Sequence, residues 1–178
     1  MFKVSEIITT PPPVFTTTLQ REIYGAFDRL GISFERVDTD PGITMEDCRN
    51  IDSKIGVQIV KTVFLCNRQQ TEFYLYVTPG DKPFITRDFC ASLGGIPRVS
   101  FAPADKLLDL TGVEPGATTI LSAILPQSAS VRLVMYRSVA DAECFACTDG
   151  TATCFVKIRT SDLLDKYIPA SGHTLTII

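Results

Sequence analysis

The sequence has little of the material from which most enzymes build an active site. It contains a single histidine, His173, and it has no G-x-G-x-x-G loop, Walker loop, G-x-S-x-G elbow or H-E-x-x-H helix. A serine–histidine triad therefore has few candidate members, and a zinc hydrolase with several histidine ligands is excluded. Because His173 lies near the C-terminus, we expect it to be a surface or packing residue.

Positive charge and long apolar runs are also scarce. Lys and Arg number 17 against 20 for Asp and Glu, a formal net charge of −3, whereas proteins that coat nucleic acid or anionic membranes are basic. No apolar run approaches the roughly 20 residues that cross a bilayer. The N-terminus lacks the apolar core of a signal peptide and is interrupted by prolines at 11–13. We expect a soluble, cytoplasmic protein without membrane contact, whose six cysteines are reduced.

A chain of 178 residues, 45% of them hydrophobic, is long enough to bury one substantial core. The sequence has no internal repeat, low-complexity tract or long linker. We therefore predict a single domain over residues 1–178. Because the triple proline favours an extended backbone, residues 1–15 are expected to form a loosely held arm.

Apolar spacing and capping residues predict two helices in the first third of the chain. The first helix has apolar residues that fall on one face: Leu19, Ile23, Phe27 and Leu30. Threonines at 16–18 offer N-cap hydroxyls, and Gly31 is placed to end this helix in a left-handed conformation. Thr44 and Asp47 form a variant of the capping box, which predicts a second helix that ends before Gly56.

Two segments rich in β-branched and aromatic residues, 59–66 and 72–78, predict a hairpin through the polar turn 67–71. Further strands are expected at 32–37, 99–102, 131–136, 153–158 and 175–178, further helices at 86–93, 103–110 and 161–167, and a turn at 41–42. Strands and helices alternate irregularly, with hairpins among them. This order favours an α/β (α+β) domain with a mixed central β-sheet flanked by helices.

Lys61 is the most unusual residue of the predicted strands, because it interrupts an otherwise apolar segment. A lysine on such a strand must reach water, pair with a carboxylate, or point into a cleft at an anion. The simplest alternative is a lysine at the end of a strand, with its ammonium group in solvent.

The segment 112–117 contains Gly112, Pro115 and Gly116. Such a loop allows the backbone to approach a ligand closely and presents amide groups in a fixed geometry. The alternative is a helix terminator followed by an ordinary turn.

Cys144 and Cys147, with Cys154 nearby, form the one cluster suited to metal binding or redox chemistry. A structural zinc site needs four ligands, and the sequence has no second pair of comparable spacing. Free cysteines also pack as small hydrophobic residues. We therefore expect no metal site and favour buried or incidental thiols, with a functional dithiol as the alternative.

Four stretches occur in an order that resembles the YbaK/prolyl-tRNA synthetase-associated domain family, and most of all its ProX, or PrdX-like, branch. They are LGISFERV (30–37), VKTVFL (60–65), YLYVTPGDK (74–82) and GVEPG (112–116). The likeness runs from about residue 19 to residue 167. Members of this family hydrolyse mischarged tRNA(Pro), and the ProX branch acts on Ala-tRNA(Pro).

The resemblance implies a pocket for the aminoacylated 3′ end of tRNA, without a cofactor. Lys61 would be the required catalytic residue, holding the terminal nucleotide or its phosphate. Gly112, Pro115 and Gly116 would line the aminoacyl pocket, while the substrate's own ribose hydroxyl helps to activate water. Hydroxyl contacts are expected from three threonines: Thr62, Thr151 and Thr153. The implied partners are the acceptor end of tRNA(Pro) and prolyl-tRNA synthetase, and the sequence does not define an oligomeric state.

Three positions depart from the family pattern. Thr62 stands where many members of the alanine branch have asparagine, and it resembles the cysteine-specific branch instead. In the stretch FACTDGTAT (145–153), Ala146 and Gly150 replace the family's histidine and asparagine. These departures leave two alternatives: a deacylase for Cys-tRNA(Pro), and a noncatalytic module of the same fold that senses tRNA or an amino acid.

Overall fold

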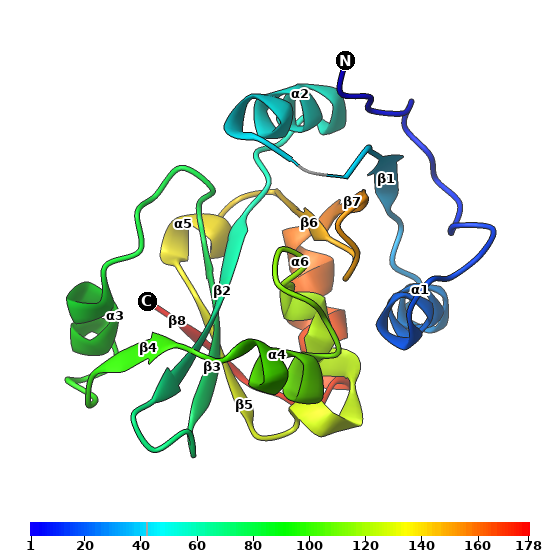
Figure 1. The fold of residues 1–178 in the computed structure, drawn as a ribbon. Helices are drawn as coiled ribbons and strands as arrows, with labels where there is room; N and C mark the ends of the chain where they lie inside the picture. Colours follow the sequence, from blue (N-terminus) through cyan, green and yellow to red (C-terminus); the bar gives the residue numbers. More distant parts are fainter. Residues whose placement is uncertain (42) are drawn as a thin grey trace.

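The chain folds into two β-sheets with helices packed around them (Figure 1). A computed structural model describes residues 1–41 and 43–178, so the expected turn at 41–42 lies partly outside the described residues. Within the described part of the chain, no helix is long and apolar enough to cross a membrane.

The larger sheet has five strands in the order β4-β2-β3-β5-β8. The strands are β2 (Lys61–Asn67), β3 (Phe73–Thr78), β4 (Val99–Phe101), β5 (Val131–Met135) and β8 (Leu175–Ile177). β2 runs antiparallel to both of its neighbours, while β5 runs parallel to β3 and to β8. The sheet is therefore mixed, as expected, and the predicted hairpin of β2 and β3 is confirmed.

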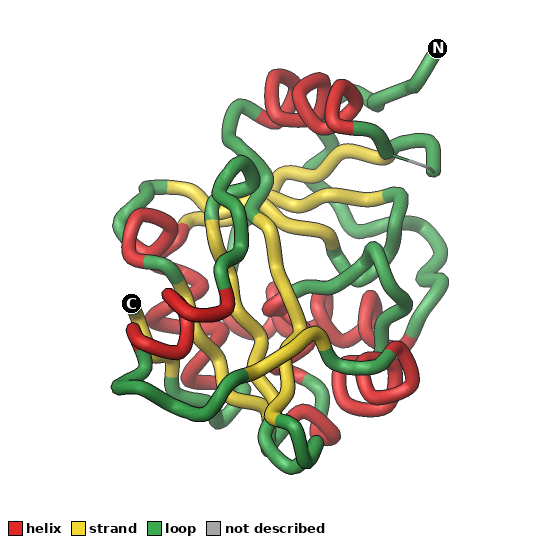
Figure 2. The backbone as a smooth tube through the Cα atoms, turned by 60° about the vertical axis from the view of Figure 1, so that its left-hand side comes forward, coloured by secondary structure: helices red, strands yellow, loops and turns green. Residues whose placement is uncertain are grey.

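The smaller sheet has three antiparallel strands in the order β1-β7-β6. The strands are β1 (Glu35–Asp38), β6 (Cys144–Thr148) and β7 (Cys154–Arg159). Figure 2 shows these strands running across the direction of the larger sheet, beneath the helix at the top. The backbone N–H of Val60 donates to the carbonyl of Ala146 at 3.0 Å and joins the two sheets just before β2 begins.

The α/β fold class with a mixed sheet flanked by helices is confirmed, and three of the strands form a second, smaller sheet. β6 was not expected. Its sequence is dominated by short side chains, so it lacks the β-branched pattern that marks the other strands. Burial rather than side-chain type stabilises it, since most of its residues are buried.

Three apolar clusters hold the layers together. The first lies between one face of the larger sheet and α1, the 3-10 turns at 120–128 and the C-terminal helical segment. The second lies on the opposite face, beneath α3, and the third lies between α2 and the smaller sheet. The helices are α1 (Thr18–Leu30), α2 (Met45–Ile55), α3 (Thr86–Ser92), α4 (Ala104–Thr111), α5 (Arg137–Ala140), α6 (Thr160–Asp162) and α7 (Ile168–Ala170).

The predicted helix ends are confirmed. The Thr17 hydroxyl accepts a hydrogen bond from the backbone N–H of Gln20, and Gly31 ends α1 with a φ of 63°. Thr44 and Asp47 form the capping box of α2, which ends at Gly56. The helix expected at 161–167 extends over 160–170 and contains a π-helical turn, Leu163–Tyr167.

Residues 1–15, predicted to be a loosely held arm, lie against β1 and α1. The backbone of Ile8 exchanges hydrogen bonds with Arg36, and the Arg36 guanidinium donates to the carbonyl of Thr10 at 2.7 Å. At the end of the arm, the ring of Phe15 stacks on Tyr24, with 6.0 Å between the ring centroids.

Candidate functional site

A cleft lies between the start of β2 and the loop that follows α4. It consists of two adjoining pockets of about 240 Å³ and 210 Å³, which share Thr62, Gly116 and Thr118. The larger pocket extends over β4 and α4 and is also lined by Val63, Phe64, Phe101, Ala102, Ala104, Leu107 and Pro115. The smaller pocket reaches the other sheet and is also lined by Ile59, Val60, Thr148 and Phe155. The cleft therefore lies where the two sheets meet.

The loop forms one wall because α4 ends directly before it. Gly112 caps α4 with a φ of 71°, and its backbone N–H donates to the carbonyl of Leu108 at 2.9 Å. Pro115 and Gly116 then lie at the cleft, and Gly116 adopts a φ of 92° that favours glycine. Of the three predicted loop residues, Pro115 and Gly116 line the pockets, whereas Gly112 acts as the helix cap behind them.

Thr62 lies at the centre of the cleft. Among the described residues, its hydroxyl oxygen is buried and has no hydrogen-bond partner. An unpaired buried hydroxyl is costly, and a polar group of a bound ligand would satisfy it.

Lys61 lies beside the cleft and is not among the residues that line either pocket. Consecutive strand residues face opposite sides of a sheet, so Lys61 leaves β2 on the face covered by α3, opposite Thr62. Its ammonium group donates to the backbone carbonyl of Lys82 at 2.7 Å. Within the described residues no ion pair involves Lys61. Its charge is therefore not neutralised by a carboxylate.

Thr151 lies in the turn between β6 and β7, and Thr153 lies just before β7; neither lines the two pockets. The hydroxyl of Thr148, which does line the cleft, donates to the backbone carbonyl of Thr151. The carbonyl of Thr153 accepts from the backbone N–H of Thr39 at 2.8 Å. Thr151 and Thr153 thus shape the turn that carries Thr148 into the cleft.

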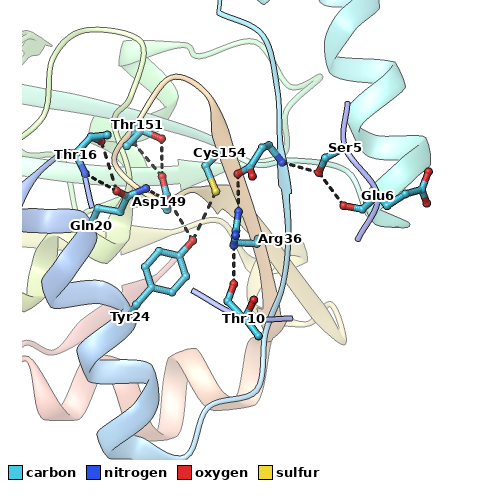
Figure 3. Close-up of polar contacts among 11 residues, drawn as sticks. Ser5, Glu6, Thr10, Thr16, Gln20, Tyr24, Arg36, Asp149, Thr151 and Cys154 are labelled. Atoms are coloured by element: carbon cyan, nitrogen blue, oxygen red, sulfur yellow. Dashed lines mark hydrogen bonds and ion pairs between the residues drawn. The ribbon is translucent and has the colours of Figure 1, made fainter. Parts of the chain in front are cut away.

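A fully buried carboxylate, Asp149, organises this turn (Figure 3). The hydroxyl of Thr151 donates to one carboxylate oxygen at 2.7 Å, and its backbone N–H donates to the same oxygen at 3.2 Å. From α1, the amide of Gln20 donates to the other oxygen at 2.8 Å, and the hydroxyl of Tyr24 donates to it at 2.9 Å. These donors replace the water that a buried carboxylate loses, and they connect the turn to α1.

Burial raises the pKa of Tyr24 far above its ordinary value of 10.0, and the negative charge of Asp149 raises it further. The tyrosine therefore keeps its proton and remains a hydrogen-bond donor at any physiological pH.

Two of the three positions that depart from the family pattern, Ala146 and Gly150, lie against packed side chains of the protein. Ala146 is fully buried in the cluster beneath α2, on the same face of β6 as Thr148. Gly150 has a φ of 89°, and a Cβ atom placed there would lie 2.7 Å from a methyl carbon of Leu19. An asparagine at 150 would therefore require Leu19 to move.

The cysteines are separated by the sheet. Cys144 and Cys147 are three residues apart on β6, so their side chains face opposite sides of the strand. Burial raises the pKa of Cys147 to about 12 and also raises the pKa of Cys154. This geometry does not favour a functional dithiol. The ring of His173 contacts the Ser128 carbonyl at 2.9 Å, consistent with a packing role.

The cleft residues that sequence patterns missed include Thr118, Thr148 and Phe101. Thr118 follows the glycine loop by two residues, so proximity to the loop was the available signal. Thr148 comes from the unexpected strand β6. Phe101 looked like an ordinary strand residue, and only its 65% exposure distinguishes it.

Comparisons with known proteins identify the family of this chain. The model of the aminoacyl-tRNA editing domain family matches residues 40–166, which is more than half of the chain. The chain belongs to this family. The prolyl-tRNA editing protein ProX of Acetoanaerobium sticklandii is 24% identical over 159 residues, which cover 89% of this chain and 96% of that protein.

Solved structures share the fold of this editing domain. The crystal structure of a hypothetical protein, APE2540, covers 88% of this chain and 97% of its own, with 21% identity and a TM-score of 0.66. A proposed trans-editing enzyme for prolyl tRNA synthetase covers 92% of this chain and 98% of its own, with 14% identity and a TM-score of 0.64. Both support the arrangement of mixed sheets and helices described above.

Proposed function

We propose that this editing domain is a trans-acting deacylase for mischarged tRNA(Pro), with Ala-tRNA(Pro) as its preferred substrate. The family typically hydrolyses mischarged aminoacyl-tRNA, and the ProX relative is named as a prolyl-tRNA editing protein. The observation that carries the proposal is the narrow cleft between Thr62 and the loop at Gly116, with its unpaired buried hydroxyl. In this proposal the reaction takes place in the cytosol, where prolyl-tRNA synthetase would supply the mischarged product.

The proposed preference for alanine requires a sieve for the amino acid. A synthetase site built for proline rejects the smaller alanine poorly, because each missing methylene group is worth only about 1–3 kcal/mol. In our proposal the aminoacyl group enters the pocket of 210 Å³, between Thr62, Thr148 and Gly116. We propose that the walls of this pocket accept the alanyl group and exclude the proline ring.

The proposed chemistry needs no protein nucleophile. None of the described residues that line the two pockets carries a carboxylate, imidazole or thiol group. The substrate's neighbouring ribose hydroxyl would help to activate the water that attacks the ester carbonyl. The chain positions the substrate: Lys61 holds a phosphate of the terminal nucleotide, and Thr62 contacts the aminoacyl group. Pro115 and Gly116 form the wall, and Gly112 caps the helix behind them. Thr151 and Thr153 contribute by shaping the turn that carries Thr148.

Substrate choice is tested with purified protein and four substrates: Ala-, Cys-, Ser- and Pro-tRNA(Pro). We expect the fastest hydrolysis with Ala-tRNA(Pro) and none with Pro-tRNA(Pro). Preferential hydrolysis of Cys-tRNA(Pro) would instead assign the chain to the activity that Thr62 resembles. If none of the four is hydrolysed, the deacylase proposal is wrong.

Replacing Lys61 provides a test of the site. We expect Lys61→Ala to lower kcat/KM for the preferred substrate by about 10- to 100-fold, because a charged hydrogen bond to phosphate contributes about 1.5–3 kcal/mol. Lys61→Arg keeps the charge with a different geometry and should retain part of the activity. Lys3→Ala removes an exposed lysine elsewhere and serves as the matched control. Undiminished turnover by Lys61→Ala would remove this residue from the mechanism.

A noncatalytic tRNA-binding module is the second candidate function. Ala146 and Gly150 favour it, because they remove the family's histidine and asparagine, and Leu19 fills the space beside position 150. Saturable binding of tRNA(Pro) without hydrolysis of any aminoacyl ester would distinguish this module from the deacylase.

A further inference from the structure

An exposed aromatic ring stands at the outer edge of the cleft. The side chain of Phe101, at the end of edge strand β4, is 65% exposed. It lines the pocket of 240 Å³ together with Thr62, Pro115 and Gly116. The packing of the sheet does not require such exposure, since the residue that pairs with Phe101 on β2, Leu65, is fully buried.

Phe101 packs against a second aromatic ring. Its ring meets the ring of Phe84 edge-on, with 5.7 Å between the centroids, and Phe84 in turn packs on the core beneath α3 through Phe89. Phe84 thus connects the ring of Phe101 to the core beneath α3. With 65% of its surface exposed, Phe101 can receive a flat partner.

The same face of β2 carries the unpaired cation. Residues that pair directly across strands share a face, and alternate residues of one strand do so too, so Lys61, Leu65 and Phe101 lie on one side of the sheet. The Lys61 ammonium contacts the carbonyl of Lys82, two residues before Phe84. A cation and an exposed aromatic ring therefore lie on the same face of the sheet, and the ring lines the edge of the cleft.

This combination is the chemistry of a single-stranded nucleotide site. Proteins that bind unpaired strands combine a positive group for the backbone with aromatic rings on which bases stack. We propose that Phe101 forms a stacking subsite for the 3′-terminal nucleobase of the bound RNA. The inference rests on the proposed function, because the ester in the cleft is attached to the ribose that carries this base.

The test compares the protein with Phe101→Ala, Phe101→Tyr and, as a control, Val14→Ala, which shortens an exposed apolar residue of the N-terminal arm. We expect Phe101→Ala to raise the KM for the mischarged tRNA on the order of tenfold, with a smaller change in kcat. Phe101→Tyr, which keeps the ring, should restore the KM. Because the side chain of Phe101 is exposed, all variants should unfold at closely similar temperatures.

A binding measurement tests the subsite without turnover. A short single-stranded RNA ending in CCA is titrated against each protein, in parallel with the same RNA lacking its terminal base. The base should strengthen binding to the wild type on the order of tenfold, and it should have little effect on binding to Phe101→Ala. A benefit from the base that is equal in both proteins would overturn the subsite.

The two proposals fail separately. Hydrolysis with a KM insensitive to Phe101→Ala would retain the deacylase and reject the subsite. A wild type that hydrolyses no substrate, yet binds the terminal base in a Phe101-dependent way, would reject the deacylase and retain the subsite.

Discussion

The side chains of Lys61 and Thr62 leave β2 on opposite faces, although they are adjacent in the sequence. Thr62 enters the cleft with an unpaired hydroxyl, while Lys61 joins the face on which Phe84 and Phe101 lie. Adjacent strand residues can therefore serve two parts of one substrate, the aminoacyl group and the nucleotide. This division follows from the period of two along a β-strand.

At the residue scale, the hydroxyl of Tyr24 is predicted to stabilise the fold. Tyr24→Phe removes the donor to Asp149 and leaves the buried carboxylate with one hydrogen bond fewer. We expect the free energy of unfolding to fall by about 1.5–3 kcal/mol, the range for hydrogen bonds to charged groups. Chemical denaturation measures it. Tyr136→Phe, at a half-buried tyrosine, is the control and should change stability by less than about 0.5 kcal/mol.

A loss of stability equal in the two tyrosine variants would contradict the role assigned to the Asp149 network. The prediction concerns stability, whereas the predictions for Lys61 and Phe101 concern substrate binding. The three variants thus separate the parts of the site that hold the fold from those that contact the substrate.

At the element scale, the turn between β6 and β7 is fixed by contact with α1. Asp149 receives hydrogen bonds from Gln20 and Tyr24, and Gly150 packs against Leu19. The turn positions Thr148 at the cleft, so α1 supports the site without lining either pocket.

Gly150→Ala should disturb this element for two reasons: its φ of 89° and the approach of the new Cβ to Leu19. We expect a loss of about 2–4 kcal/mol in unfolding free energy, combining backbone strain with overpacking. Gly31→Ala is the matched control, because it has a φ of 63° and no atom near the added Cβ, so it carries the strain alone.

Removing the obstruction should reduce the penalty. In a double-mutant cycle, we compare the loss in free energy of unfolding of the double variant, Gly150→Ala with Leu19→Ala, with the sum of the losses of the single variants. The loss of the double variant should be smaller than this sum by on the order of 1 kcal/mol. Strict additivity would mean that Leu19 does not limit the space at position 150.

At the scale of the whole molecule, buried thiols link stability to alkaline pH. Burial raises the pKa of Cys147 from 9.0 to about 12, and burial followed by the charge of Asp149 raises that of Cys154. Their stabilising contribution is therefore complete below pH 9, where both thiols stay protonated in either state. It declines as pH rises above 9, because the unfolded chain then loses protons that the folded chain keeps.

We expect the free energy of unfolding to fall by about 1.4 kcal/mol per pH unit for each such thiol between pH 9.5 and 11. Denaturant midpoints at several pH values measure this slope. Cys147→Ala should reduce this slope by the contribution of one thiol. Cys144→Ala alters a half-buried thiol and serves as the control, which should leave the slope unchanged. An unchanged slope in Cys147→Ala would contradict the assignment.

The local features were the most predictable from sequence. Thr17 and Gly31 bound α1, Thr44 and Asp47 cap α2, and the hairpin of β2 and β3 forms where the aromatic and β-branched residues lie. These features depend on neighbouring residues, so short-range patterns carry them. The resemblance to the editing family also depended on four short stretches, and the family was confirmed.

Only the tertiary structure decided how these elements combine. The pairing of β1 with β7 and the hydrogen bonds from α1 to the buried Asp149 join residues more than 100 positions apart. The placement of Lys61 beside the cleft, and of Phe101 at its edge, likewise follows from strand pairing and from the path of the loop after α4. Such pairings gain their stability from buried area and hydrogen bonds between distant segments, which local sequence patterns do not encode.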